Sequence, residues 1–188
     1  MGISVFSWGI LGVLHDLQET SVTLPRFCIC VLHFCVGWLF LRRQMEVKSA
    51  TIEQYLLVMP CFVAGGVVFL RSQPLVQWPG YCNIIFLLGS VLTIGALLRL
   101  GNSFALFPGV RTVVTKGLYA HIRHPVYLGE SIMVWACVLA CANVINFALG
   151  GVAQIAIVVR ILVEESVLSQ EYGLYRKTVP WRLVPGIW

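Results

Sequence analysis

Two short stretches of this sequence carry side chains that could bind charged groups. In HIRHPVYLGE, residues 121–130, two histidines, an arginine and a glutamate surround Pro125. In RILVEES, Arg160 and Glu164 are four residues apart and share one face of a helix. The first turn of a helix favours anions, and arginine and glutamate bind groups of opposite charge. An ion pair at the level of the lipid headgroups is the simpler interpretation of Arg160 and Glu164 and remains open.

The composition shows which elements must position these side chains. Of the 188 residues, 59% are hydrophobic and 11% are charged, and the mean hydropathy is +0.86. Soluble domains carry roughly 25% charged residues, so we expect an all-α, polytopic integral membrane protein. About 20 apolar residues cross the hydrocarbon layer as a helix. Five stretches are long enough, and helices are predicted at 25–41, 52–70, 81–100, 125–142 and 144–163.

The last two predicted helices connect the two polar stretches, one of which includes the start of the first helix and the other the end of the second. Only the residues ANVIN separate these helices, which predicts a tight antiparallel hairpin. Pro125 suits the first helical turn, where its missing N–H is not needed. The loop before the hairpin and the tail after it then meet at one end and are predicted to form a pocket. We expect one membrane domain, with N-terminal helices over 1–98 and a functional core over 99–188.

The seven cysteines lie mostly within apolar stretches. None forms a CxxC pair, and none is close to histidines at the spacing of a zinc site. We interpret them as small core residues, and no metal site is expected.

The basic residues predict the orientation of the chain in the membrane. Five crossings place alternate connections on opposite sides. Eleven of the thirteen lysines and arginines fall after the first helix, after the third helix or near the C-terminus. The N-terminus is therefore predicted outside and the C-terminus in the cytoplasm, across the plasma membrane of a prokaryote or the endoplasmic reticulum of a eukaryote. This bias and anionic membrane lipids account for the net charge of +5, so no nucleic-acid partner is expected.

The motifs of the C-terminal half resemble those of one family. TVVTKGLYAHIRHPVYLG is followed, after one helical hairpin, by RILVEESVL and then by YRKTVPWRLVPGIW. This order is similar to that of the isoprenylcysteine carboxyl methyltransferases, which are integral membrane enzymes related to the phospholipid N-methyltransferases. The resemblance covers roughly residues 99–188 and implies a cytoplasmic pocket for S-adenosylmethionine. The tail is about one helical turn shorter than the family pattern, so Tyr172 and Tyr175 are given no role.

The resemblance also implies roles for individual residues. The positions that match the family's cofactor-binding residues are Arg111, Thr112, Val113, Val114, Tyr119, His124, Pro125, Val126, Tyr127 and Glu164. Arg160 matches an arginine that binds the substrate, and Glu165 is a candidate catalytic residue. The cofactor carries an ammonium, a carboxylate and a sulfonium. Glu164, donors near His124 and the face of Tyr119 or Tyr127 suit these three groups in turn.

The implied reaction is methyl transfer to a carboxylate on a lipophilic substrate that enters from the bilayer, such as a prenylated cysteine or another lipid. A carboxylate is ionised at neutral pH and needs no general base. It needs to be positioned and partly desolvated, and Arg160 would do both.

Other functions remain open. Methylation of phosphatidylethanolamine requires the amine to lose a proton, for which Glu165 or Glu130 would serve as base. A small thiol is another candidate acceptor. A non-catalytic transporter or lipid-binding scaffold would need ionisable residues along the middle of its helices. These are nearly absent from the predicted helices apart from His33 and Glu130.

Overall fold

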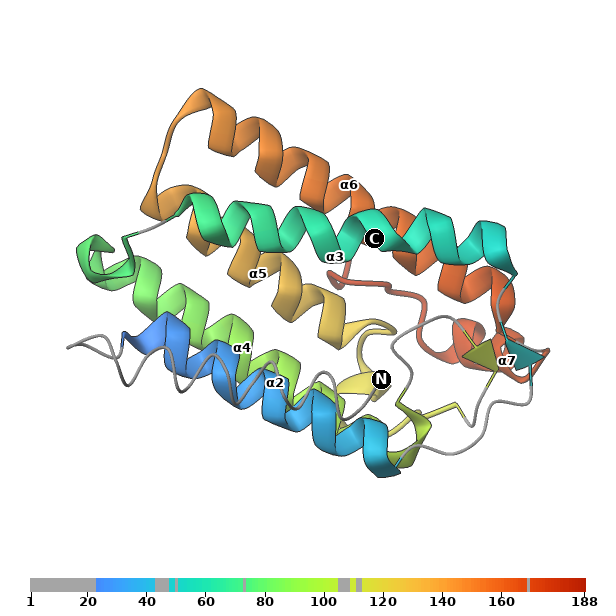
Figure 1. The fold of residues 1–188 in the computed structure, drawn as a ribbon. Helices are drawn as coiled ribbons and strands as arrows, with labels where there is room; N and C mark the ends of the chain where they lie inside the picture. The colour runs from blue at the N-terminus through green and yellow to red at the C-terminus, as the bar shows by residue number, and fades with distance from the viewer. Residues whose placement is uncertain are drawn as a thin grey trace.

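The described part of the chain is a helical bundle (Figure 1). The structure is a computed structural model that describes residues 23–42, 48–49, 51–72, 74–104, 109–110, 113–168 and 170–188. Its helices are α2 (Leu24–Arg42), α3 (Ile52–Arg71), α4 (Gly80–Leu100), α5 (Pro125–Ala140), α6 (Val144–Val167) and α7 (Gln170–Thr178). The two-residue strands β1 (Lys48–Ser49) and β2 (Gly109–Val110) pair antiparallel. The predicted all-α fold is confirmed apart from this short ladder.

The five predicted membrane helices are found close to their predicted bounds. Four of them, α2, α3, α4 and α6, are long and apolar enough to cross a membrane. α5 has only 16 residues, because the helix ends before a turn at Cys141 rather than at 142. α6 has 24 residues and continues past the predicted end at 163. Glu164 and Glu165 therefore lie in the last turns of a helix rather than in a tail.

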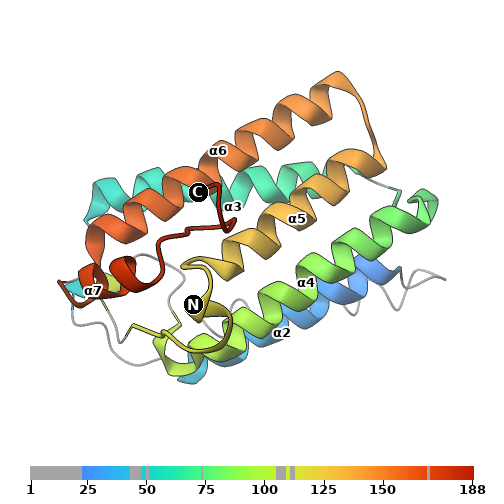
Figure 2. The ribbon, with the colours of Figure 1, turned by 180° about the vertical axis from the view of Figure 1, so that it is seen from behind.

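The helices of the bundle pack in pairs. α4 lies against both α2 and α5, and α3 lies against α6 (Figure 2). The largest core cluster contains Cys28, Cys82, Phe86 and Cys137, which are buried between α2, α4 and α5. The prediction that cysteines serve as core residues holds for the four that are buried, while the other three are partly exposed: Cys30, Cys35 and Cys141. Many large apolar side chains outside this core are exposed, as expected for a surface that faces lipid.

α4 and α5 approach each other closely at two glycines. A Cβ atom added at Gly129 of α5 would lie 2.1 Å from Thr93 Oγ1 and 2.6 Å from the carbonyl oxygen of Gly89. Thr93 cannot easily turn away, because its hydroxyl donates a 2.9 Å hydrogen bond to that same carbonyl. This contact fixes α5, which begins with the HPVY residues, against α4.

Replacing Gly129 with alanine is expected to destabilise the bundle by about 1–3 kcal/mol, since the two backbones must separate to admit the methyl group. Thermal unfolding of the detergent-solubilised protein would measure the loss. Gly95→Ala in α4 is the matched control, because nothing lies within 4 Å of its added Cβ. Equal effects of the two substitutions would contradict the close approach.

The hairpin of α5 and α6 is tight, as predicted. The side chain of Asn143 caps α6 by accepting a 2.9 Å hydrogen bond from the amide of Asn146. Asn146 in turn donates to the carbonyl oxygen of Cys141 at 2.7 Å and accepts from Arg71 Nε of α3 at 3.1 Å. These bonds tie α3 to the hairpin at the end of the bundle away from the HPVY residues.

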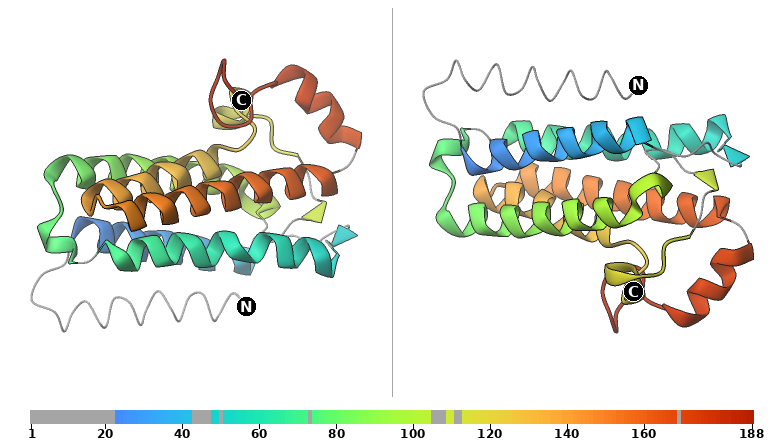
Figure 3. Two further views of the ribbon diagram at one scale, coloured as in Figure 1. Left: turned by 90° about the horizontal axis from the view of Figure 1, so that it is seen from above. Right: turned by 90° about the horizontal axis from the view of Figure 1, so that it is seen from below.

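The opposite end, which we call the polar end, contains the end of α2, the start of α3, the end of α4, the start of α5 and the end of α6 (Figure 1). α7 and the C-terminal segment, residues 179–188, lie beside the bundle near this end (Figure 3). The predicted meeting of the loop before α5 with the C-terminal residues is confirmed. Placement of the polar end in the cytoplasm stays a prediction.

Candidate functional site

The site begins at the N-terminus of α5. Pro125 occupies the first turn, as predicted, and His124 is the N-cap residue. A short 3-10 helix, η3 (Gly117–Ala120), leads into this start. Gly117 has a φ of +67°, and an added Cβ would lie 3.1 Å from Arg99 Nε at the end of α4. A side chain at this position would therefore be strained and crowded, so glycine is what lets the loop turn beside α4.

Glu165 of α6 is the centre of an ionic network. Its Oε1 lies 2.8 Å from Arg123 Nη1 and 3.0 Å from His124 Nε2. Its Oε2 lies 3.1 Å from both Nε and Nη2 of Arg182. Tyr172 donates its hydroxyl to Oε1 at 3.2 Å and lies equally close to His124 Nε2. Both carboxylate oxygens are thus engaged by groups from the loop, α7 and the C-terminal segment.

Backbone hydrogen bonds reinforce this network. The amides of Arg123 and His124 donate to the carbonyl oxygens of Trp181 and Arg182, both at 2.9 Å. Arg123 Nη2 also donates to the carbonyl oxygen of Pro180 at 3.0 Å. These hydrogen bonds hold the C-terminal segment against the residues that precede α5. The ion pair of Arg182 with Glu165 links the same segment to α6.

A second cluster lies beside the first, between α3, α5 and α6. The hydroxyl of Tyr127 donates a short hydrogen bond to Glu164 Oε2. The guanidinium carbon of Arg160 lies 5.0 Å from the centre of the Tyr127 ring and 4.3 Å from that of Phe62. Arg160 is only 6% exposed, and its Nη1 donates to Cys61 Sγ at 4.0 Å. A carboxylate and a buried guanidinium are therefore arranged around one aromatic ring.

Two further tyrosines lie between the loop and α7. Tyr175 donates its hydroxyl to the carbonyl oxygen of Tyr119, and Tyr119 donates to that of Ala96 at 3.4 Å. Burial raises the pKa of Tyr175 to about 12. Burial, and then the carboxylate of Glu164, raise the pKa of Tyr119 still further. Both side chains are neutral hydrogen-bond donors at physiological pH.

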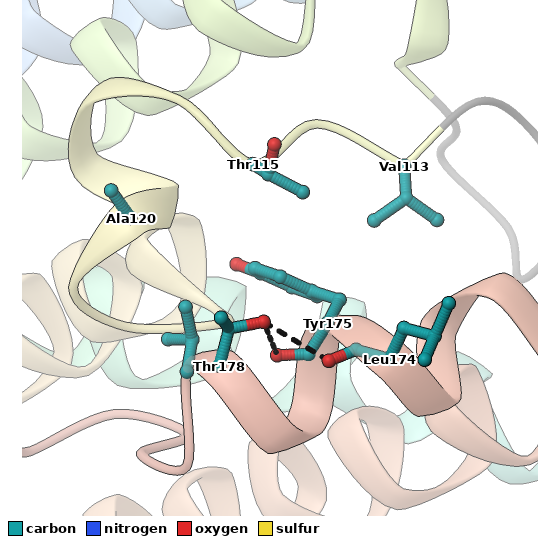
Figure 4. A pocket seen from close by; sticks show the side chains of 7 residues that line it. Val113, Thr115, Ala120, Leu174, Tyr175 and Thr178 are labelled. Carbon is teal, nitrogen blue, oxygen red and sulfur yellow. Dashed lines mark hydrogen bonds between the residues drawn. The ribbon is translucent and has the colours of Figure 1, made fainter.

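A cavity of about 540 Å³ lies between residues 113–120 and α7 (Figure 4). Its lining residues are Val113, Thr115, Ala120, Leu174, Tyr175, Thr178 and Val179. The ring of Tyr175 lies between the loop and the helix in this view. Sites for small organic ligands have volumes of about 300–1,000 Å³, so the cavity is large enough for part of a cofactor.

The structure brings most of the predicted site residues together at the polar end. Tyr119, His124, Pro125, Tyr127 and Arg160 are buried, and Val113, Val114, Val126, Glu164 and Glu165 are partly buried as whole residues. The side chain of Glu165, taken alone, is only 5% exposed. The three valines pack against the cluster that contains Tyr119, Tyr172 and Tyr175. Arg111 and Thr112 lie outside the described residues. The functions assigned to all these residues stay predictions.

Several residues of the site had no predicted role. Tyr172 and Tyr175 contact His124 and Tyr119, and Arg182 contacts Glu165. Phe62 contacts Arg160 from α3. The two tyrosines are spaced three residues apart, which places them on one face of α7, and this spacing was a usable signal.

Comparison with known proteins identifies the family of the chain. The profile of the phospholipid methyltransferase family matches residues 80–174, which is half of the chain. The match extends from the start of α4 into α7 and includes the ionic network of Glu165 except Arg182. The chain is also 27% identical to the protein-S-isoprenylcysteine O-methyltransferase of Schizosaccharomyces pombe over 209 aligned positions. That alignment covers 95% of this chain and 87% of the yeast protein.

Proposed function

The chain belongs to the phospholipid methyltransferase family, and on that premise we propose that it uses S-adenosylmethionine to methylate a carboxylate on a lipophilic substrate. A prenylated cysteine is the proposed acceptor, as the name of the yeast relative suggests. The observation that carries the choice of a carboxylate is the buried guanidinium of Arg160 beside Tyr127 and Glu164.

The described residues suit S-adenosylmethionine in charge, and the cavity beside α7 is large enough for part of it. When bound, this cofactor supplies a methyl group on a positively charged sulfur. The carboxylate of Glu164 suits its ammonium group, and the rings of Tyr119 and Tyr127 suit its sulfonium. The cavity beside α7 offers apolar walls, the Tyr175 ring and the hydroxyls of two threonines to the adenosyl part. With the polar end in the cytoplasm, this cavity would be open to the cofactor.

Arg160 favours an anionic acceptor. Its guanidinium presents several N–H donors in a plane, which matches the two oxygens of a carboxylate. Arg160 is almost fully buried, so water screens its charge little. Its attraction for a nearby anion is therefore strong. Here Arg160 would hold the acceptor oxygen in place and keep water away from it.

The family match favours a second candidate acceptor, the amine of phosphatidylethanolamine. Such an amine must lose a proton before it attacks, and its nitrogen gains positive charge during methylation. The buried guanidinium of Arg160 would oppose that gain of charge, whereas the carboxylates of Glu130 and Glu164, which interact with Arg160, would favour it. The name of the yeast relative therefore ranks the amine second.

Calorimetric titration of the detergent-purified protein with S-adenosylmethionine tests the cofactor assignment. We expect saturable binding both of the cofactor and of its demethylated product. Folded protein that binds neither ligand would rule out the proposed function.

A labelled-methyl assay tests the acceptor. The protein is incubated with methyl-labelled cofactor and either an N-acylated S-farnesyl cysteine or phosphatidylethanolamine. Label that is released as methanol by mild base is expected from the cysteine substrate, because a methyl ester is base-labile. Base-stable label on the phospholipid would identify the amine as acceptor instead.

Replacing Arg160 with alanine is expected to lower the rate of methylation of the cysteine substrate about 100-fold or more, because the acceptor carboxylate loses a charged partner. Affinity for S-adenosylmethionine should change little, and its measurement also shows that the variant is folded. Arg160→Lys keeps the charge without the planar group and should retain a small part of the turnover. Full turnover by Arg160→Ala would point to an amine or thiol acceptor.

A further inference from the structure

Phe62 of α3 contacts the guanidinium group of Arg160. The ring centre lies 4.3 Å from the guanidinium carbon, which is closer than the 5.0 Å to the Tyr127 ring. The neighbouring residue Cys61 accepts from Arg160 Nη1 at 4.0 Å. Two consecutive residues of α3 therefore contact one end of the Arg160 side chain.

This contact brings a third helix into the site. α3 packs along α6, and Phe62 lies near the middle of α3. Residues 52–71 precede the part of the chain matched by the family profile, which begins at residue 80. Nothing in the motifs of the C-terminal half assigns a role to this helix.

We propose that Phe62 is a positioning residue that orients the Arg160 guanidinium toward the acceptor carboxylate. The proposal rests on the proposed function for the identity of the acceptor. Phe62 contacts the arginine rather than the reacting atoms, so it acts through Arg160.

The physical basis is the attraction between a cation and the face of an aromatic ring. This attraction is stronger at a desolvated site, and Arg160 is 6% exposed. An arginine side chain has several rotatable bonds, and each alternative rotamer would move its donors away from a bound carboxylate. With Phe62 and Tyr127 both in contact, the planar group is held before the acceptor arrives. Binding the acceptor then requires less ordering of the arginine.

Kinetics of three variants test this role. Phe62→Leu keeps an apolar side chain but removes the ring, whereas Phe62→Tyr keeps the ring. We expect Phe62→Leu to raise KM for the farnesyl cysteine about tenfold, with the Kd for S-adenosylmethionine unchanged. Phe62→Tyr should restore most of the wild-type KM. Phe69→Leu on the same helix is the matched control, because Phe69 packs on Phe86 in the core cluster and should leave KM unchanged.

A second measurement does not depend on turnover. In protein labelled with ¹⁵N-arginine, the Nε–H signal of Arg160 is identified by its loss in Arg160→Lys. Because the guanidinium carbon lies over the Phe62 ring as well as near that of Tyr127, we expect an upfield proton shift that decreases in Phe62→Leu, where only Tyr127 contributes, and persists in Phe62→Tyr.

The two measurements separate the possible failures. An Arg160 signal with no ring-current shift, or one that is identical in wild type and Phe62→Leu, would overturn the role of Phe62 whatever the activity. A rise in KM for the cysteine in Phe62→Leu that is matched by an equal rise in Kd for the cofactor, without rescue by tyrosine, would also overturn it, because it would indicate a purely structural role. A wild-type protein that does not methylate the cysteine refutes the acceptor assignment, while the spectrum still decides whether Phe62 orients Arg160.

Discussion

Replacing Glu165 with glutamine is expected to lower the free energy of unfolding by about 3–5 kcal/mol, because it removes the negative charge that compensates Arg123. The side chain of Arg123 is only 4% exposed, and that of Glu165 is 5% exposed. An uncompensated guanidinium at such a site cannot be hydrated fully. The C-terminal segment, which Arg182 links to Glu165, is expected to detach more readily as well.

Thermal unfolding in detergent would show this loss as a decrease in Tm of about 10 °C. Glu53→Gln is the matched control, since Glu53 is an exposed acid in the first turn of α3. Arg182→Gln should cost less than Glu165→Gln, and the double variant should cost less than the sum of the two, since the side chains interact directly. An unchanged Tm together with an altered pH dependence of turnover would instead support Glu165 as a general base.

Replacing Glu164 with glutamine is expected to weaken binding of S-adenosylmethionine by about 10- to 100-fold. A hydrogen bond between charged groups is worth about 1.5–3 kcal/mol, and each 1.4 kcal/mol is a tenfold change in affinity. Glutamine can still accept the hydroxyl of Tyr127, so the local fold should persist while the attraction for an ammonium group is lost.

Calorimetry with the purified variant measures this effect, and Tyr127→Phe provides the comparison. That substitution removes the hydroxyl that Glu164 accepts but leaves the carboxylate charge and the aromatic ring in place. Its effect on affinity should therefore be the smaller of the two. If Glu164→Gln binds the cofactor as tightly as the wild type does, the ammonium group is held elsewhere.

The helices could be predicted from the sequence because their signals are local. Long apolar runs identify the membrane helices, and Pro125 marks the first turn of α5. The resemblance of the C-terminal motifs then indicated which side chains should gather at one end. The bound at 163 was wrong because Glu164 and Glu165 look like the start of a polar tail, whereas their contacts keep them inside α6.

The partners of individual side chains could not be predicted, because they depend on contacts between distant parts of the chain. Arg123 precedes Glu165 by 42 residues and Arg182 follows it by 17, and no local pattern joins the three. Phe62 is one apolar residue in an apolar helix, so its type alone gave no sign of a contact with Arg160. Such pairs form only when α3, α5 and α6 pack together, so they can be identified only from the folded structure.

If α5 crosses the membrane as predicted, its shortness sets the depth of the site in the bilayer. Its 16 residues extend over about 24 Å, whereas the hydrocarbon layer is about 30 Å thick. With the turn at Cys141 at one boundary of that layer, Pro125 lies about 6 Å below the other boundary. The N-terminal turn of α5, where Pro125 is enclosed by protein, would then lie below the level of the headgroups. A lipid-anchored acid could present its carboxylate there without withdrawing its hydrocarbon tail from the membrane.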